Sequence, residues 1–451
     1  MTTAAGSSEF YLAQFSAAEN HLPGHDAPWA TAWRRNALDR FRELGFPGHR
    51  DEDWKYTSVK ALEKQPFDSV LEPSSHLALT DIERLIPAGV ECIRIVFVNG
   101  HFSRVLSDTA AMPAGAEVSS LATKLRDEPA AVESLLENSP TVFRNGFGAL
   151  NAAFMTDGIF IRLAPRTVLK QPIWLLFISG DQDRAITSQC RNVIVADTDS
   201  QATIVEHYST TGGKATFTNS VTSITVNDNA RVTHIKLQQE NTTGFHFSEI
   251  DVTQNRDSFY HSHSVALGAA LARTDIRVTL QAEGAECRLD GLYMGDGRQH
   301  VDHHTRIDHL KPHGKSTEYY KGVLNGNARA VFNGKVVVHE RAQKTDSSQT
   351  NRNLLLSRNS EIDTKPELEI YADDVKCAHG ATIGQLDDDA IFYLRSRGVD
   401  EALARNLLTF AFVDDVIRRI EIAPLRKQLE QTILNRLPAG TSLRGLVYND
   451  A

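Results

Sequence analysis

Cysteine is scarce in this chain, which has four cysteines among its 451 residues, at positions 92, 190, 287 and 377. No two of them form a CxxC motif or a close pair. This spacing excludes a disulfide framework and a four-thiolate metal site supplied by a single segment. A thiolate-bound metal or cluster would need ligands from distant segments or from another chain.

Long apolar runs and basic clusters are also missing. No apolar run approaches the roughly 20 residues of a membrane-spanning helix, and residues 1–9 lack the basic segment and apolar core of a secretory signal. We therefore expect a cytoplasmic protein that does not enter the membrane. The formal net charge of −9, without a long basic cluster with interleaved aromatics, argues against a nucleic-acid partner.

The motifs of common enzymes are incomplete or missing. Gly314-Lys315-Ser316 resembles the end of a phosphate-binding loop, but His309 stands where that loop needs a glycine. There is no GxGxxG that opens a helix after a strand, no HExxH and no GxSxG. We therefore predict that the chain binds no nucleotide directly.

What the sequence does contain, from about residue 159, is a series of short segments rich in valine, isoleucine, threonine and aromatic residues. Turns of glycine, asparagine and aspartate separate them, and no amphipathic helix intervenes. This pattern predicts many short strands. Examples are 191–196, 202–208, 221–226, 276–280 and 335–339.

A weak repeat accompanies these segments. Small residues that follow polar turns recur at intervals of 28, 28 and 27, at Ala202, Ala230, Ser258 and Ala285. Intervals of 14 then separate Gly314, Ala328 and Ala342. A period of about 14 residues, or twice that, favours a stacked β-solenoid with two strands per turn. A sandwich or barrel would also have many short strands but requires no fixed period.

Helical patterns flank the predicted strands. Residues 29–44 have apolar side chains at helical spacing, and Gly45 is suited to end that helix. Residues 91–107 are typical of two short strands about a turn at Asn99-Gly100, and residues 118–154 are again helical. We predict three domains: a mostly helical one over 1–150, a β core over 151–382 and a helical one over 383–451.

The C-terminal helical region contains one continuous apolar stripe. The three acids at 387–389 suit a helix N-terminus, where capping explains them. The stripe packs for the most part on neighbouring helices. Docking of a partner on a free face is a second hypothesis for its residues Leu403, Leu407, Phe410, Val413 and Ile417.

Cys377 and His379 are the strongest candidate ligands. Residues two apart on an extended strand share a face, so this thiol and imidazole can address one metal ion or one iron of a cluster. The positive charge of Lys376 is expected to lower the pKa of the thiol. The alternative is a buried cysteine beside a hydrogen-bonded histidine.

Other histidines give weaker signals. His261 and His263 share a strand face, but no partner for them is identifiable from sequence. Five more histidines within 14 residues resemble a zinc site, but their spacing fits no closed ligand set and strand alternation would place them on both faces. These are His300, His303, His304, His309 and His313.

Two segments resemble a known family. Residues 333–357 (NGKVVVHERAQKTDSSQTNRNLLLS) and 361–398 (EIDTKPELEIYADDVKCAHGATIGQLDDDAIFYLRSRG) are similar to the C-terminal signature of the SufB/SufD proteins, with weaker resemblance over 273–324. Residues 51–57 (DEDWKYT) are similar to an ExWKYT element of SufD members. SufB members often carry an N-terminal cysteine cluster, whereas Cys92 is alone in the first 189 residues here.

The resemblance implies a right-handed parallel β-helix flanked by N- and C-terminal helical domains. It implies a non-enzymatic scaffold that pairs with SufB through the β-helix and docks the SufC ATPase through its C-terminal helices. A transient iron–sulfur cluster would form at the interface with SufB, with His379 as a ligand and Cys377 beside it. One thiol and one imidazole cannot replace the four cysteines that commonly hold a cluster, so a site shared between chains fits.

Two alternatives to this interpretation remain. One is a SufB-like scaffold that works as a homodimer, and the isolated chain could itself form a homodimer. The other is a polysaccharide-active β-helix enzyme, although no spaced acidic set is visible on the strand segments. Cys287 is expected to be a buried residue of a solenoid turn.

Overall fold

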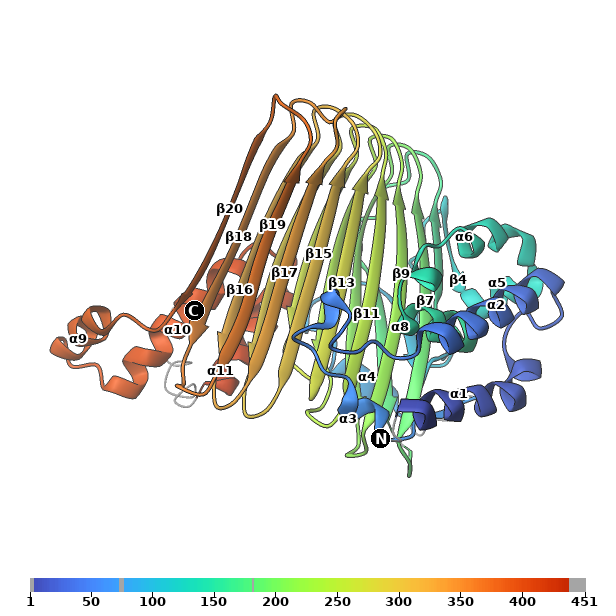
Figure 1. The fold of residues 1–451 in the computed structure, drawn as a ribbon, viewed down its shortest axis with the longest axis horizontal. Helices are drawn as coiled ribbons and strands as arrows, with labels where there is room; N and C mark the ends of the chain where they lie inside the picture. Colours follow the sequence, from blue (N-terminus) through green and yellow to red (C-terminus); the bar gives the residue numbers. More distant parts are fainter. Residues whose placement is uncertain (1–3, 73–76, 181, 438–451) are drawn as a thin grey trace.

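Two long parallel sheets, stacked face to face, dominate the computed structural model (Figure 1). The structure describes residues 4–72, 77–180 and 182–437. Each turn of the chain adds one strand to each sheet, which is the arrangement of a parallel β-helix. Helices flank the β-helix at both ends of the chain, so the predicted fold class is confirmed.

The two sheets are named sheet A and sheet B. Sheet A is built from β5 (Ile159–Leu163), β7 (Ile186–Ala196), β9 (Thr216–Val226), β11 (Phe245–Gln254), β13 (Leu271–Leu280), β15 (His300–His309), β17 (Arg329–Val338) and β19 (Glu361–Ile370). Sheet B is built from β6 (Ile173–Gly180), β8 (Gln201–Thr211), β10 (Arg231–Gln239), β12 (Phe259–Ala266), β14 (Glu286–Gly295), β16 (Lys315–Leu324), β18 (Asp346–Leu355) and β20 (Lys376–Gly384). All five strand segments singled out in the sequence fall mainly within these strands.

Strands from the N-terminal segment close the first end of the solenoid. In sheet B, β2 (Ile93–Val98) runs parallel to β6, and β3 (His101–Phe102) turns back on it. In sheet A, β4 (Ala116–Ser120) pairs antiparallel with β5, and β1 (Asp68–Ser69) pairs with β7. The predicted strand pair about Asn99-Gly100 is therefore present, and it covers one end of the β-helix core.

The repeat predicted from small residues is real, but two of its positions, Ala202 and Ala342, were wrong. Backbone hydrogen bonds join each turn to the next just before the sheet B strands, and they stack Ala230, Ser258, Ala285 and Gly314. The member of this column in the preceding turn is Ser200, not Ala202, since Arg231 N–H donates to the Ser200 carbonyl. Asp346 N–H donates to the Gly314 carbonyl, so Thr345 and not Ala342 follows Gly314 in the column before the sheet B strands. The space at the bend is filled equally well by serine or alanine, so residue size alone did not fix the register.

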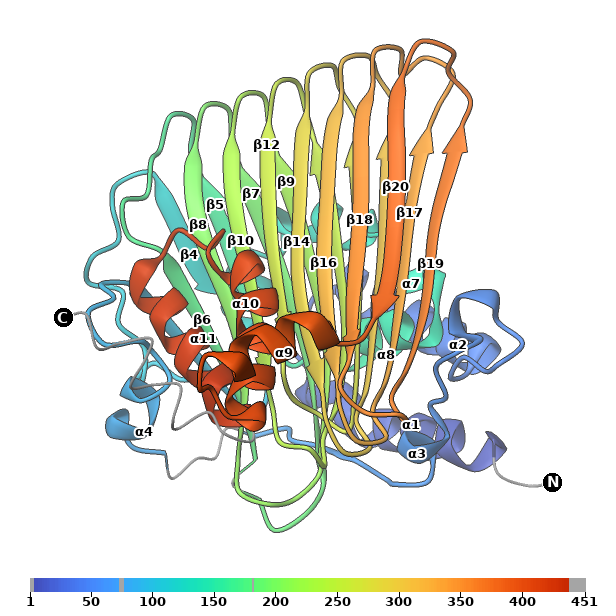
Figure 2. The same ribbon diagram turned by 90° about the vertical axis from the view of Figure 1, so that its left-hand side faces the viewer.

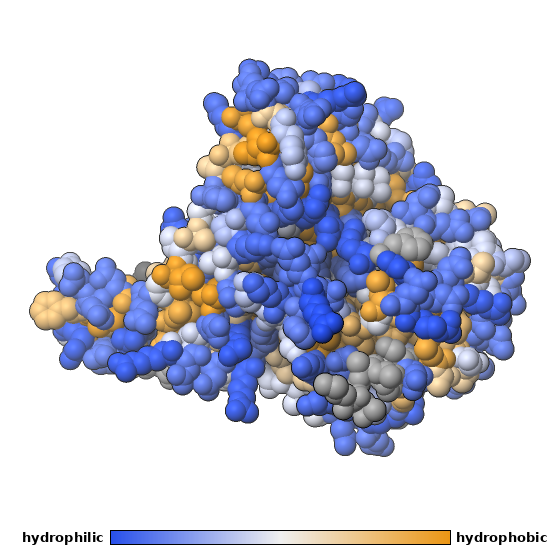
Figure 3. Space-filling view, in the orientation of Figure 1, coloured by the Kyte–Doolittle hydropathy of each residue, from blue (hydrophilic) through white to orange (hydrophobic). Residues whose placement is uncertain are grey.

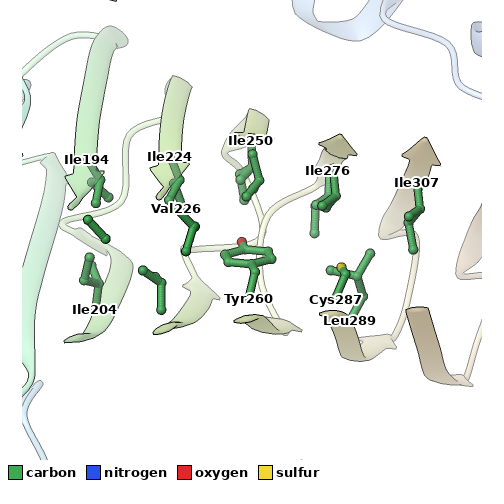
Figure 4. Close-up of a cluster of buried hydrophobic side chains, with 14 of the residues drawn as sticks. Ile194, Ile204, Ile224, Val226, Ile250, Tyr260, Ile276, Cys287, Leu289 and Ile307 are labelled. Atoms are coloured by element: carbon green, nitrogen blue, oxygen red, sulfur yellow. The ribbon is translucent and has the colours of Figure 1, made fainter. Parts of the chain in front are cut away.

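The inner faces of the two sheets meet in a core that is apolar along one side (Figure 4). One ladder of inward side chains runs through sheet A in exact register from turn to turn: Ile194, Ile224, Val252, Val278, Ile307, Val336 and Leu368. Cys287 is fully buried among these side chains, as predicted. The other side of the interior holds buried polar groups that bond to one another, such as Glu206 with Thr222 at 2.7 Å.

The N-terminal helices cover the outer face of sheet A. They are α1 (Ala4–Ala18), α2 (Pro28–Leu44), α3 (Lys60–Glu63), α4 (Leu79–Glu83), α5 (Leu121–Asp127), α6 (Glu133–Glu137), α7 (Thr141–Arg144) and α8 (Gly146–Phe154), of which α4 packs on the sheet B side. Helix α2 ends at Leu44, and Gly45 follows with φ of 62°, as the sequence predicted. Phe41 and Phe147 pack here with Phe217 and Phe247 of the sheet.

Of the C-terminal helices, α10 (Glu401–Ile417) and α11 (Ala423–Arg436) lie across the outer face of sheet B (Figure 2), whereas α9 (Asp388–Ser396) projects away from it (Figure 1). Asp387 caps α9, because its Oδ1 accepts the N–H groups of Asp389 and Ala390. No helix within the described ranges combines the length and the apolar character needed to cross a membrane.

Candidate functional site

The last strand of sheet B, β20, forms an open end of the solenoid. It pairs with β18 on one side, and no described strand pairs with its other side. Lys376 N–H donates to the Thr345 carbonyl of the preceding turn. Because alternate residues of a parallel strand bond to opposite sides, the odd-numbered residues of 377–383 direct their N–H and C=O groups to the open edge.

Cys377 and His379 share one face of β20, as the sequence predicted. They pair in register with Ser347 and Gln349 of β18, whose buried side chains lie on the inner face of the solenoid. Cys377 is half-buried against the end of the apolar core. His379 is exposed, because no further turn lies over it among the described residues. Its ring has no hydrogen-bond partner in the described part of the chain, so both ring nitrogens are available.

The pKa of the Cys377 thiol is raised, which corrects the expectation from Lys376. Burial of the sulfur is the main cause, and the nearby Asp346 carboxylate adds to it. The Lys376 side chain lies on the opposite, exposed face of the strand. The free chain therefore presents a protonated thiol beside an accessible imidazole, and a metal ion would have to displace the thiol proton.

The turn before β20 fixes where the strand begins. Lys344 has φ of 64° and its N–H donates to the Asp374 carbonyl. The Asp374 N–H donates to Gln343 Oε1 at 2.9 Å, and the Lys344 ammonium forms an ion pair with the Asp374 carboxylate. These contacts hold the start of β20 in register with the preceding turn, so the position of Cys377 is set by the solenoid itself.

Apolar side chains are exposed around this open end. Ile370 and Tyr371, at the end of β19, are 43% and 60% exposed, and Ile383 on β20 is 51% exposed. An unpaired strand edge next to exposed apolar side chains is a surface to which another chain can add.

The apolar stripe of α10 is divided by the fold. Phe410, Val413 and Ile417 are buried in a core shared with sheet B, whereas Leu403 and Leu407 are half-buried. Lys321 of β16 reaches the Phe412 carbonyl at 2.7 Å and fixes α10 on the sheet. The buried three cannot contact a partner unless α10 leaves the sheet, so most of the stripe packs within the chain.

Helix α9 presents the exposed apolar groups of the C-terminal region. Phe392 is 72% exposed and Tyr393 is 56% exposed. The helix projects from the solenoid in Figure 1, and Figure 3 shows apolar patches along this arm. Sequence reasoning missed these two residues because it followed the longest stripe, whereas α9 is a short helix with few neighbours.

The five histidines of residues 300–313 do not converge on one site, as the strand alternation predicted. His303 and His309 are buried on the inner face of β15, and His313 lies in the following turn. His300 and His304 face outward, where His300 Nε2 lies 2.9 Å from Thr57 Oγ1 and His304 Nε2 lies 3.1 Å from an Asp302 oxygen. Each of the five therefore has a polar partner within the chain, which for His303 and His309 is a buried serine and for exposed His313 is Glu283.

The DEDWKYT element docks the N-terminal segment on sheet A. The Trp54 ring stacks on the Phe147 ring with centroids 5.3 Å apart, and the Arg273 guanidinium lies 3.7 Å from the centroid of the Trp54 ring. Thr57 Oγ1 donates to Asp302 Oδ2 at 2.5 Å. The motif that resembles SufD members therefore acts here as a clamp between the N-terminal segment and the solenoid.

Asp290 is a residue that sequence reasoning missed. It lies directly opposite His263 on the neighbouring strand, and its Oδ2 is 2.8 Å from His261 Nε2. The 27-residue interval between Ser258 and Ala285 is the signal that could have found it, because the same step leads from His263 to Asp290.

The other three cysteines are free and distant from Cys377 in the sequence, and burial raises the pKa of each of their thiols.

Family models cover nearly the whole chain. Residues 5–175 match the SufBD protein N-terminal region, and residues 177–412 match the SufBD core domain of the SUF system for iron–sulfur cluster assembly. The boundary between the two matches falls within β6, in the first turns of the solenoid.

Individual relatives agree with these matches. The chain is 36% identical over 411 residues to an iron–sulfur cluster assembly SufBD family protein of Synechocystis, which covers 89% of each chain. It is 33% identical to the iron–sulfur cluster assembly protein SufD of Escherichia coli, over 89% of this chain and 92% of the relative. The SufD of Bacillus subtilis is 26% identical over 94% and 96%. With a solenoid that carries the family signature on its last strands, this chain belongs to the SufBD family of iron–sulfur cluster assembly proteins.

Proposed function

We propose that this chain is a SufD-like, non-enzymatic scaffold subunit that works in the cytoplasm as part of a SufBCD complex. It supports assembly of an iron–sulfur cluster at its interface with SufB, under control of the SufC ATPase. The observation that carries the proposal is the open strand β20, which presents Cys377 and His379 on one face beside an unpaired edge.

The ligand count supports a site shared between two chains. Clusters commonly take four cysteine ligands, and this end of the solenoid offers one thiol and one imidazole. His379 is accessible and has no hydrogen bond to give up, whereas the Cys377 thiol must lose its proton. We therefore assign His379 as the principal ligand and Cys377 as an assisting one, with the remaining ligands on SufB. The cluster is a transient cargo of the site.

The edge of β20 supports pairing through the β-helix. The odd-numbered residues 377–383 offer an unsatisfied row of backbone donors and acceptors, to which a strand of SufB adds. Exposed Ile383 and Tyr371 would be covered in the same contact. A second copy of this chain offers the same edge, so the isolated chain forms a homodimer where SufB is absent, and a SufB-like homodimeric scaffold is the second candidate.

The C-terminal helices support docking of the ATPase. Phe392 and Tyr393 on α9 are exposed, and Leu403 and Leu407 at the start of α10 are half-buried next to them in the chain. The buried part of the stripe, Phe410 to Ile417, joins this surface to sheet B. ATP hydrolysis on SufC moves these helices, and the solenoid transmits the movement to the open end where the ligands lie.

The first experiment compares the intact chain with His379→Ala, each co-expressed anaerobically with SufB and SufC. Iron content and visible absorption report the cluster, and gel filtration reports the complex. His313→Ala is the matched control, because that histidine is also exposed but lies in a turn of an earlier strand pair. We expect an assembled complex in all cases and loss of iron only in His379→Ala. Normal iron content in His379→Ala would move the ligand site to SufB alone.

A second experiment tests the edge. In Ala381→Pro the lost N–H points to the open edge, so the hydrogen bonds to β18 remain. We expect loss of SufB binding and of the homodimer, with unchanged circular dichroism. Lys376→Ala, on the exposed face of the same strand, is the control and should bind SufB normally. Full SufB binding by a folded Ala381→Pro chain would exclude strand addition at β20.

A further inference from the structure

A second set of ligand-type side chains lies on the outer face of sheet B, away from β20. His261 and His263 project from β12, and Asp290 projects from the adjacent β14 directly opposite His263. The loop that joins α10 to α11 passes over them, and its Arg419 reaches Asp290. The three side chains are therefore enclosed between the solenoid and the C-terminal helices.

The geometry brings three ligand atoms to one point. One ring nitrogen of each histidine and a carboxylate oxygen of Asp290 all lie within 4.8 Å of one another. The two imidazole centroids are 4.1 Å apart, and His261 Nε2 lies 2.8 Å from Asp290 Oδ2. Two imidazoles and one carboxylate form a ligand set that zinc and ferrous iron both take.

His263 is the independent sign that something is bound. Its residue is 2% exposed, yet neither ring nitrogen has a hydrogen-bond partner in the described part of the chain. Buried polar groups are nearly always satisfied, so an orphaned imidazole requires an explanation. A neutral imidazole has a lone pair on one ring nitrogen, which is the group that a metal ion takes from histidine.

We propose that His261, His263 and Asp290 form a binding site for a divalent first-row transition-metal ion. The ion replaces the hydrogen bond between His261 Nε2 and Asp290 Oδ2, whose proton moves to the other ring nitrogen of His261 or to solvent. The ion also gives His263 the partner that it lacks. Water supplies the fourth ligand. Because the set lies on a different strand pair from Cys377 and His379, this site is separate from the proposed cluster site and does not depend on it.

Arg419 positions the carboxylate for this role. Its Nη1 lies 2.8 Å from Asp290 Oδ1, which leaves Oδ2 directed to the histidines, and its guanidinium lies 4.0 Å from the Tyr319 ring centroid. Metal-bound carboxylates usually accept such a second hydrogen bond. The ion would thus tie β12 and β14 to the α10–α11 loop, and it would stabilise the attachment of the C-terminal helices to the solenoid.

The test uses the full chain freed of metal by a chelator and titrated with Co²⁺, followed by its visible d–d bands, and with Zn²⁺ by calorimetry. We expect one tight equivalent in the wild type. Removal of a ligand in His263→Gln or Asp290→Asn should weaken metal binding by more than about tenfold. Mutation of residues that only hydrogen-bond to metal ligands already lowers metal affinity by about 10–100-fold. His303→Gln, at another buried histidine, and His379→Ala should bind normally.

Two further measurements test the site even if a variant fails to fold. X-ray absorption of the Zn²⁺-loaded wild type should show scattering from two imidazoles and no sulfur. Zn²⁺ should raise the melting temperature of the wild type and of His379→Ala, but not that of Asp290→Asn. No tight equivalent in the wild type, or equal binding by the wild type and a folded Asp290→Asn, would overturn the proposal. Loss of cluster in His379→Ala with normal Co²⁺ binding would separate the two sites.

Discussion

Ile417 is the residue at which the attachment of the C-terminal helices can be measured. Its side chain is 0% exposed in the core that α10 and α11 share with sheet B. Ile417→Ala removes three carbon atoms, which at about 0.8 kcal/mol per buried methylene is worth about 2.4 kcal/mol. The cavity left in a packed core brings the expected loss to about 3 kcal/mol, within the usual range of about 2–5.

The assay combines urea unfolding, followed by circular dichroism, with hydrogen exchange of α10 and α11. We expect faster exchange confined to these helices at low urea, because they leave the sheet before the solenoid unfolds. Leu403→Ala is the matched control: it lies on the same helix but is half-buried, so its loss should stay below about 1 kcal/mol.

The result also separates packing from docking. Phe392→Ala, at an exposed site, should change stability by less than about 0.5 kcal/mol but weaken SufC binding. Ile417→Ala should weaken SufC binding only as far as the helices detach. If Ile417→Ala lowers the free energy of unfolding by less than about 1 kcal/mol and does not speed hydrogen exchange in α10, Phe410, Val413 and Ile417 do not belong to the core of the chain.

Three further predictions concern the solenoid interior and its N-terminal clamp, and urea unfolding measures each. Gly291→Ala should cost about 1–3 kcal/mol, because its Cβ would lie 2.0 Å from the Tyr320 ring; an unchanged midpoint would mean that the ring can move. Arg273→Met should cost about 3–5 kcal/mol, because it removes the guanidinium charge that lies 2.9 Å from the buried Asp302 carboxylate, and a second change Asp302→Asn should restore part of the loss. Burial raises the pKa of Glu318 from 4.5 to about 7, so the folded state holds its proton more tightly and wild-type stability falls as pH rises between these values. Glu318→Gln removes this loss, so between pH 5 and pH 8 it should gain up to about 3 kcal/mol relative to the wild type; a pH-independent difference would contradict the assignment.

Most of the architecture was predictable because it is local. The β-rich composition of the strands, the turn residues and the helix caps at Gly45 and Asp387 all depend on neighbours in the sequence. The structure places the strands and these two caps where the sequence indicated. The period of the solenoid was also visible. The misplaced Ala202 shows the limit of that signal: the bend accepts any small side chain, so composition alone cannot fix register to the residue.

The candidate sites were predictable only in part, because they depend on contacts between turns. Cys377 and His379 are two residues apart, so strand alternation alone places them together. The raised pKa of Cys377 depends on burial and on Asp346, thirty-one positions away in the sequence, which outweigh the adjacent Lys376. Asp290 belongs to the turn after His263 and could be paired with it only through the repeat. Which residues of the α10 stripe are buried could not be predicted from the sequence, because it depends on the apolar outer face of sheet B.

The difference between the two ends of the solenoid has a consequence for how the molecule comes apart. The middle turns are held by the helices on both outer faces, whereas the contacts of β19 and β20 are mainly with their neighbouring strands, so the stability of this last turn depends on the turn before it, as in a one-dimensional chain of coupled units. The first end is closed by strands of the N-terminal segment, β3 on β2 and β4 on β5, whereas among the described strands β20 has a neighbour on one side only. Unravelling should therefore begin at β20 and proceed backwards, and Cys377 and His379, the ligands proposed here, lie on the least cooperative unit of the β-helix. A partner that adds a strand there would complete the ladder, and the contact proposed to share the cluster would also protect the solenoid from fraying.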